Sequence, residues 1–226
     1  MRLSSIRRYP VKSMGGESLD SVQIDRRGLD GDRWFAVVDD EGKLASGKTT
    51  RRFRRRDAVF DHRAATTDAG VEVTNDAGTW RVGDAALDEV LSDRMGARVR
   101  VASEQRTSHF DDGAVSLVGT ATVDWFKREW GVDADPRRLR ANLVITTDEP
   151  FAEERWMGRT MTIGSVDLTV TDRVPRCRMI DLAQDGVTAG RRWLTRLALE
   201  REMCAAVYLD VRRPGTLSVG DAVTVD

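Results

Sequence analysis

Runs in which apolar and polar residues alternate dominate this chain. Alternation with a period of two predicts half-buried β-strands, and turns such as Asp30-Gly31 separate the runs. In the first half of the chain the predicted strands are 33–38, 70–74, 79–82 and 97–101. In the second half they are 143–146, 161–163, 166–171, 204–211 and 222–225, and residues 214–221 (PGTLSVGD) predict a turn, a strand and a second turn.

Three segments instead have the three-to-four-residue apolar spacing of helices. The first begins after Asp84, an N-cap candidate, and ends at Gly96; the second covers 120–130, and the third covers about 189–203. The polar stretch 103–113 is the best candidate for a boundary between two parts of the chain. The pattern therefore predicts an α+β protein, predominantly β, with a few peripheral helices and two parts that pack together.

Composition narrows the classes of function. The 226 residues include 36 Lys and Arg against 37 Asp and Glu, and the resulting net charge of −1 argues against a protein that coats a polyanion. Two Cys and two His are too few for a closed zinc site, a Cys-ligated iron–sulfur cluster or a disulfide framework. The N-terminal MRLSSIRRYP lacks the apolar core of a signal peptide, and no apolar run approaches about 18 residues. We expect a cytoplasmic protein with no membrane partner.

The most informative segment is 172–181 (DRVPRCRMID). It places Cys177 between Arg176 and Arg178, and nearby guanidinium charges favour the thiolate form of a cysteine. This is the setting expected of a reactive or metal-ligating thiol. A buried structural thiol is the alternative, and it stays open, since strand alternation can send both arginines to the opposite face. Cys204 lies in an apolar run, which favours a core position.

Three further segments carry groups that can hold an anion. In YPVKSMGG, Lys12 and Ser13 offer a charge and a hydroxyl donor, although the spacing is not that of a Walker P-loop. The turn GLDGDRW delivers Arg33 into a strand, and RRLRAN offers Arg140 and Asn142 on one side of an entering strand. Each segment taken alone is better explained as a solvated turn or a structural ion pair.

The basic run 48–56 (KTTRRFRRR) raises the alternative of nucleic-acid binding through phosphate neutralisation. The slightly acidic chain and the absence of any accompanying nucleic-acid motif argue for a solvated face, or for one wall of an anion pocket. His109 could serve as the base of a Cys–His pair, but no third orienting group accompanies it. We therefore expect no nucleic-acid partner.

Four of these segments occur in an order typical of one family. YPVKS, GLDGDRWFAVVD, RLRANLVI and VPRCRMIDL together resemble the MOSC proteins, and more narrowly the two-part group that includes the amidoxime-reducing molybdenum proteins. The resemblance covers essentially the whole chain. It implies an N-terminal MOSC β-barrel domain over 1–105, packed on a β-barrel MOSC domain over 106–226.

The resemblance also implies a molybdenum–molybdopterin cofactor. Cys177 matches the family's thiolate ligand, which would make it both the metal ligand and the catalytic residue. The cofactor-binding positions implied for this chain are Lys12, Ser13, Arg33, Arg52, Asp112, Arg140, Asn142 and Arg176. Asp112 is a departure, because the related proteins carry small hydroxyl residues there. A carboxylate repels a phosphate, so Asp112 is either turned away or marks a changed pocket.

The implied activity is reduction of the N–O bond in a small N-hydroxylated substrate, such as a hydroxylamine, hydroxamic acid or amidoxime. Electrons would come from a separate flavin- or ferredoxin-type reductase, because this chain has no second redox centre. The alternative is a carrier of the molybdenum cofactor or a sulfur-transfer protein, in which Cys177 cycles through a persulfide.

Overall fold

The largest element of the protein is an eight-stranded sheet. The computed structural model describes residues 1–132, 134–190 and 192–226. The strand order is β18 (Val223–Val225), β14 (Thr160–Ile163), β15 (Val166–Pro175), β16 (Cys204–Arg213), β12 (Val115–Gly119), β13 (Leu143–Ile145), β1 (Leu3–Arg8) and β2 (Glu17–Leu19). β12 and β13 are parallel, and the other neighbours are antiparallel.

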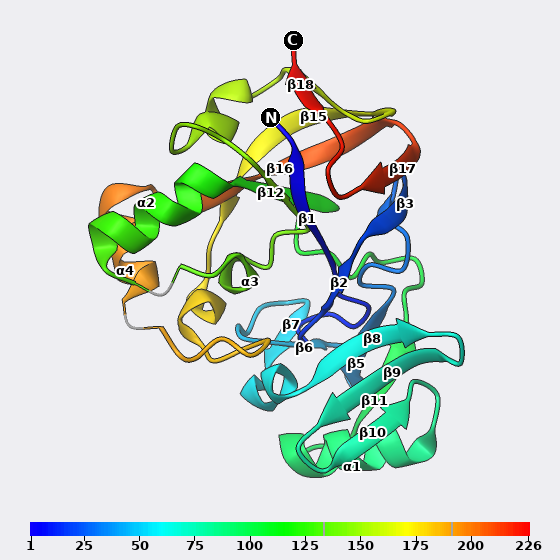
Figure 1. Cartoon of the computed structure of the whole chain (residues 1–226). Coiled ribbons are helices and arrows are strands. Elements are labelled where there is room, and N and C mark those ends of the chain that lie inside the picture. The colour runs from blue at the N-terminus through cyan, green and yellow to red at the C-terminus, as the bar shows by residue number, and fades with distance from the viewer. Residues whose placement is uncertain (133, 191) are drawn as a thin grey trace.

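The sheet curls, but no ladder of described strands closes it into a barrel. An isolated antiparallel bridge, Arg2 with Ala222, joins the residue before β1 to the residue before β18, and both termini lie at the same end of the molecule (Figure 1). The expectation of closed barrels is therefore corrected. The rest of the prediction, an α+β protein that is predominantly β, is confirmed.

Three smaller sheets complete the β-structure. One has the order β11 (Val99–Ser103), β5 (Phe35–Asp39), β6 (Leu44–Ser46) and β7 (Phe53–Arg55). A second contains β10 (Gly78–Arg81), β9 (Gly70–Asn75) and β8 (Arg63–Thr67). The third pairs β17 (Gly215–Ser218) with β3 (Ser21–Asp25) and β4 (Gly28–Leu29). The first strands of the chain thus pair with its last ones, while residues 35–103 fold together below them (Figure 1).

Two of the three predicted helices form as expected. α1 (Ala85–Met95) and α2 (Thr120–Trp130) both end at a glycine in the left-handed conformation. The predicted third helix is too long: α4 spans only Trp193–Glu200, because Glu202 and Met203 have positive φ angles and residues 189–190 are not helical. Residue 191, inside the predicted span, lies outside the described residues. None of the helices in the described part of the chain has the length and apolarity to cross a membrane.

Short helices occupy four connections. They are η1 (Asp57–Asp61), α3 (Pro136–Leu139), η2 (Ala152–Trp156) and η3 (Arg178–Asp181). In α3 the Asp135 carboxylate caps the first turn by accepting a hydrogen bond from the Arg137 backbone N–H, and Pro136 takes the first position.

Separate apolar clusters hold the parts together. One fills the inside of the large sheet, and a second packs α2 and α4 through a set of aromatic rings that includes Phe126 and Trp193, whose centroids lie 5.2 Å apart. A third cluster packs α1 against the lower sheets. Met179, two residues after Cys177, packs against this third cluster, so the segment with the cysteine bridges the two parts of the molecule.

Candidate functional site

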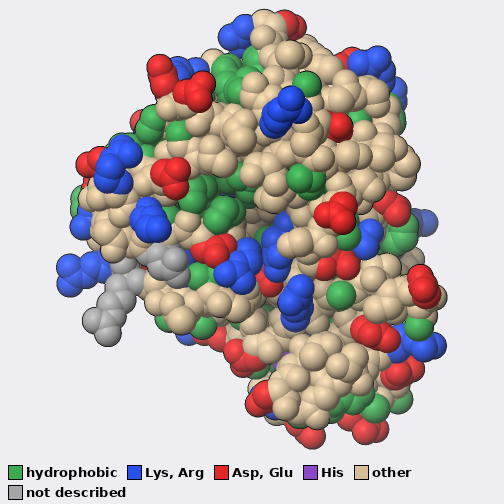
Figure 2. All heavy atoms as spheres, viewed as in Figure 1, with side chains coloured by type: hydrophobic (Ala, Val, Ile, Leu, Met, Phe, Trp, Pro, Cys, Tyr) green, Lys and Arg blue, Asp and Glu red, His purple; other side chains and the backbone are tan. Residues whose placement is uncertain are grey.

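A polar cleft lies where the loops of the two parts meet. β1 runs antiparallel to β13, and β12 runs parallel to β13, so the carboxyl end of β1 and the amino ends of β12 and β13 share one edge of the sheet. The cleft has a cavity volume of about 250 Å³. Lys and Arg side chains gather between the upper and lower parts of the molecule (Figure 2). The described lining of the cleft includes six cationic side chains and two carboxylates: Lys12, Arg33, Lys48, Arg138, Arg140 and Arg176, with Asp111 and Asp112.

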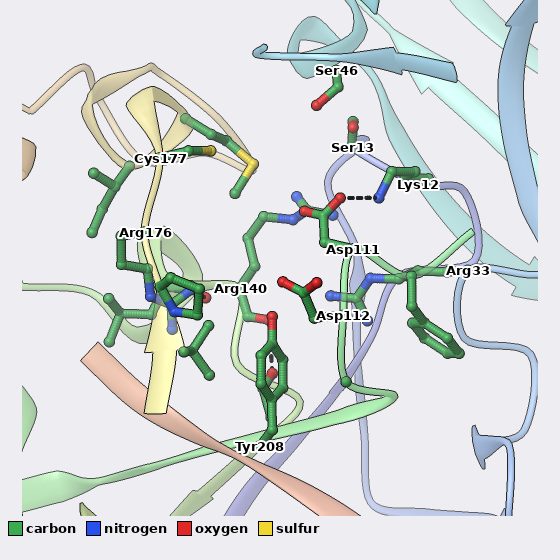
Figure 3. Close-up of a pocket in the computed structure, with 18 of the residues that line it drawn as sticks. Lys12, Ser13, Arg33, Ser46, Asp111, Asp112, Arg140, Arg176, Cys177 and Tyr208 are labelled. Atoms are coloured by element: carbon green, nitrogen blue, oxygen red, sulfur yellow. Dashed lines mark hydrogen bonds and ion pairs between the residues drawn. The ribbon is translucent and has the colours of Figure 1, made fainter. Parts of the chain in front are cut away.

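Lys12 and Ser13 lie in the loop between β1 and β2, on the side of the cleft opposite Cys177 (Figure 3). Both side chains are buried. The Lys12 ammonium donates to Asp111 Oδ1 at 2.9 Å, and Ser13 Oγ donates to the carbonyl of Ala45 at 3.1 Å. Burial lowers the pKa of Lys12 to about 8, although Asp111 opposes that shift. A lysine this deeply buried and this easily deprotonated is typical of a functional site.

Asp111 is the residue that the sequence reasoning missed. Its carboxylate sits between Lys12 and Lys48, whose Nζ is 3.7 Å away. Burial raises the pKa of Asp111, but the two ammonium groups outweigh this and lower it, so the carboxylate stays charged. Asp112, the predicted departure, is exposed and lines the cleft. Both alternatives stated for Asp112, a carboxylate turned away from the phosphate and a changed pocket, stay predictions.

Arg140 is the residue of the cleft best suited to bind an anion. It caps α3 in the left-handed conformation, with φ of +50°, and is only 5% exposed. Its guanidinium carbon lies 4.1 Å from the centre of the Tyr9 ring. Both terminal nitrogens, Nη1 and Nη2, are buried without a hydrogen-bond partner among the residues that the structure describes. A buried charged donor without an acceptor is costly, so the arrangement fits an anionic group bound in the cleft.

Asn142 lines the cleft but uses its side chain to join strands. Its Oδ1 accepts from the Ser116 backbone N–H at 3.2 Å and from Ser116 Oγ at 3.1 Å, while Nδ2 donates to the Arg7 carbonyl at 3.2 Å. The amide therefore fixes the shared sheet edge from which the loops that line the cleft emerge.

Arg33 also lines the cleft, immediately before β5. It adopts a positive φ of 53°, ion-pairs with the buried Asp32, and lies over the Tyr9 ring at 5.0 Å. Its position is thus set by a carboxylate and an aromatic face. Figure 3 shows its guanidinium pointing toward Asp112.

Cys177 follows β15 and lines the opposite side of the cleft, half-buried and without a disulfide to any residue that the structure describes. Its neighbours are engaged elsewhere. Arg176 donates to the carbonyls of Leu139 at 2.7 Å and Ala205 at 2.6 Å, and burial lowers its pKa to about 10. Arg178 forms a bidentate pair with Asp57 at 2.9 and 2.8 Å. Arg176 therefore holds the chain before Cys177 against the part of the molecule that contains Leu139 and Ala205. Arg178 holds the chain after it against the part that contains Asp57.

Comparison with known families decides where this chain belongs. The MOSC domain matches residues 104–224, and the MOSC N-terminal beta barrel domain matches residues 1–77. The chain belongs to the MOSC family. The resemblance inferred from the four sequence motifs is thereby confirmed.

Among curated proteins, this MOSC chain is similar to molybdenum cofactor sulfurases. The protein from Caenorhabditis elegans is 25% identical over 199 residues, which cover 76% of this chain and 28% of that protein. The protein from Danio rerio is 44% identical over 52 residues, which cover 23% of this chain and 6% of that protein. The MOSC chain therefore spans less than a third of the length of these relatives.

Among solved structures, the YuaD protein from Bacillus subtilis has a similar fold. It aligns with a TM-score of 0.51 and 14% sequence identity, covering 99% of this MOSC chain and 94% of YuaD. At this identity the likeness concerns the fold alone.

Some of the predicted residues lie away from the cleft of the MOSC protein. Arg52 does not line it; its guanidinium instead donates to the carbonyls of Ser108 and Phe110, and so supports the loop that carries Asp111. His109 does not line the cleft either, so no Cys–His pair forms there. Its Nδ1 contacts the Arg33 carbonyl at 3.1 Å.

One interpretation of the sequence needs correction, and one is supplemented by the structure. Cys204 is not a core residue: it is half-buried, and its thiol donates to the Glu202 carbonyl at 3.4 Å. The basic run 48–56 is partly neutralised within the fold, because Arg54, Arg55 and Arg56 make ion pairs with Glu41, Asp57 and Asp39. This pairing reduces the charge available for binding a polyanion.

Proposed function

We propose that this MOSC protein binds the molybdenum cofactor in the cleft and reduces N-hydroxylated compounds. The observation that carries the proposal is Arg140, whose two buried, unpartnered nitrogens face a cleft that also holds the Cys177 thiol. A cofactor with a phosphate and a pterin requires, on one side, hydrogen-bond donors for the phosphate and flat polar groups against the pterin. On the other side it requires a thiolate. The described lining offers both.

Each cleft residue has a distinct part in this proposal. Arg140 and Lys12 hold the phosphate by charge, and Arg33 contacts the pterin with its planar guanidinium. Cys177 supplies the thiolate ligand of the metal. Arg176 and Asn142 act indirectly: through their hydrogen bonds to backbone groups they keep the Cys177 segment and the sheet edge in place.

When bound, the cofactor supplies a molybdenum centre that can exchange two electrons with a substrate. Reduction of a hydroxylamine consumes two electrons and two protons, breaks the N–O bond, and yields an amine and water. The electrons come from a separate reductase, since the chain has two cysteines in all and no second redox centre. Around the cleft, burial raises the pKa of Tyr208, so its hydroxyl keeps its proton and can donate a hydrogen bond to a bound substrate.

The proposal is tested by producing the protein in cells that synthesise the cofactor. Pterin content is measured by fluorescence after oxidation, and benzamidoxime reduction is measured with reduced methyl viologen as electron donor. We expect Arg140→Met to lose most of the pterin, and the exposed Arg98→Met to retain it. Pterin bound without benzamidoxime reduction would exclude the reaction, and no pterin in the wild-type protein would exclude the binding.

A second function is sulfur transfer. It is favoured by the similarity to proteins named molybdenum cofactor sulfurases, together with the presence of Cys177, which forms no disulfide with a described residue, in the cleft. In that role Cys177 carries a persulfide, whose outer sulfur passes to an acceptor. Cyanide treatment distinguishes the two functions: it releases thiocyanate from a persulfide, and the release must be lost in Cys177→Ser and kept in Cys204→Ser.

A further inference from the structure

A second hollow lies on the other side of the loop that forms one wall of the cleft. It has a cavity volume of about 440 Å³. Its apolar floor is one face of the sheet that contains β5, β6 and β11: Val38 pairs across the strands with both Leu44 and Arg100, and Ala102 follows two residues later on the same face as Arg100. We call this space, lined by Val38, Gly42, Leu44, Arg51, Arg52, Arg100, Ala102, Ser103, Gln105, Arg106, Thr107 and His109, the arginine hollow.

Four arginines surround this apolar floor, and no carboxylate is among the described lining residues. The side chains of Arg51, Arg100 and Arg106 are exposed and make no hydrogen bond or ion pair with any residue that the structure describes. Neighbouring arginines behave differently, because Arg54 and Arg56 both pair with Asp39. The charge of the hollow is thus left uncompensated in a chain whose net charge is only −1.

The chemistry of the lining specifies a type of ligand. Guanidinium groups match the geometry of phosphate and carboxylate, and a cleft lined by one sign of charge concentrates ions of the opposite sign. The floor of Val38, Leu44 and Ala102 offers contact to an apolar or aromatic group. Ser103, Gln105 and Thr107 add neutral hydrogen-bonding groups at the rim. The volume lies within the roughly 300–1,000 Å³ typical of small-molecule sites.

We propose that the arginine hollow is a second binding site, for a small organic anion that combines a phosphate or carboxylate with a compact apolar body. This inference does not depend on the function proposed for the cleft. A nucleic acid fits less well, because a small apolar floor suits one compact group better than a continuous phosphate backbone. Of the basic run 48–56, only Arg51 and Arg52 line the hollow.

The hollow is connected to the cleft by the segment 107–112. Thr107 and His109 face the hollow, while Phe110 to Asp112 line the cleft. Arg52 lines the hollow and also holds the carbonyls of Ser108 and Phe110. A variant that tests the hollow must therefore spare Arg52, and Arg100 and Arg106 meet this condition.

The test is isothermal titration of the full chain with phenyl phosphate, benzoate and inorganic phosphate. We expect phenyl phosphate to bind about tenfold more tightly than inorganic phosphate, because only the former uses the apolar floor. Arg100→Gln with Arg106→Gln should weaken phenyl phosphate binding by at least about tenfold. Benzoate binding should be weakened by the same two substitutions, because a carboxylate also matches the geometry of a guanidinium group.

Two controls separate the hollow from the cleft and from general surface charge. Arg98→Gln removes a highly exposed arginine near the start of β11 and should leave the affinity unchanged. Because Arg140 is proposed to hold a phosphate in the cleft, the titrations are repeated with Arg140→Met, and the phenyl phosphate binding that this variant retains is assigned to the hollow. The proposal is overturned if Arg140→Met abolishes phenyl phosphate binding while the double variant retains it. It is equally overturned if the arginines bind a single-stranded oligonucleotide but show no saturable binding of phenyl phosphate.

Discussion

Lys12 provides the most quantitative prediction. Its side chain is 5% exposed, and burial lowers its pKa from an ordinary value of 10.5 to about 8. Each pKa unit corresponds to about 1.4 kcal/mol, so keeping this ammonium charged in the folded protein costs about 3 kcal/mol of stability near neutral pH. Lys12→Met removes that cost. Because the buried lysine is unfavourable for folding, we infer that its role is to bind an anion.

The pH dependence follows from the direction of the shift. The folded-state pKa lies below the unfolded value, so the unfolded chain binds more protons between about pH 8 and pH 10.5. The destabilisation of the folded protein by Lys12 therefore decreases as the pH rises through that window, and the free energy of unfolding increases. Between pH 7 and pH 10 the wild-type protein should gain about 2 kcal/mol relative to Lys12→Met.

Urea denaturation of both proteins at pH 7 and pH 10, with cofactor absent, measures this difference. Lys127→Met is the matched control, because Lys127 is exposed on α2 and should show no such pH-dependent difference. A Lys12→Met difference that stays constant between the two pH values would refute the burial of a charged Lys12.

Two other predictions concern charge in the cleft and packing around it. Asp111→Asn leaves two lysines without their carboxylate partner, so titration with inorganic phosphate should show affinity raised by about tenfold, while Asp112→Asn should have a smaller effect; equal effects of the two variants would contradict the assigned pairing. Trp193→Ala removes a fully buried ring that packs on Phe126 and should cost about 3–5 kcal/mol in urea denaturation; a loss below about 1 kcal/mol would contradict this packing.

Periodicity predicted most of the strands and two helices because their register is regular. It missed β1, where Leu3 and Ile6 both face the core although they are three residues apart. A shift of register between Leu3 and Ser5 breaks the alternation there. The predicted end of α4 was wrong for a similar reason, since the backbone turns at Glu202 and Met203 without a glycine to signal it.

The site was predictable in its residue types but not in its pairings. Motifs identified Lys12 and Cys177 as cleft residues, as the structure places them. The ion pair between Lys12 and Asp111 joins positions 99 residues apart, and no local pattern encodes it. Likewise, spacing placed Arg176 and Arg178 beside the thiol, whereas tertiary contacts direct both guanidinium groups to other partners.

Molybdenum content per chain tests the central claim most directly. The protein and its two single-cysteine variants are produced with functional cofactor synthesis, and the metal is quantified by elemental analysis. The account predicts about one molybdenum per wild-type chain, near-complete loss in Cys177→Ser, and full retention in Cys204→Ser. Full molybdenum content in Cys177→Ser, or equal loss in both variants, would contradict the assignment of Cys177 as the metal ligand.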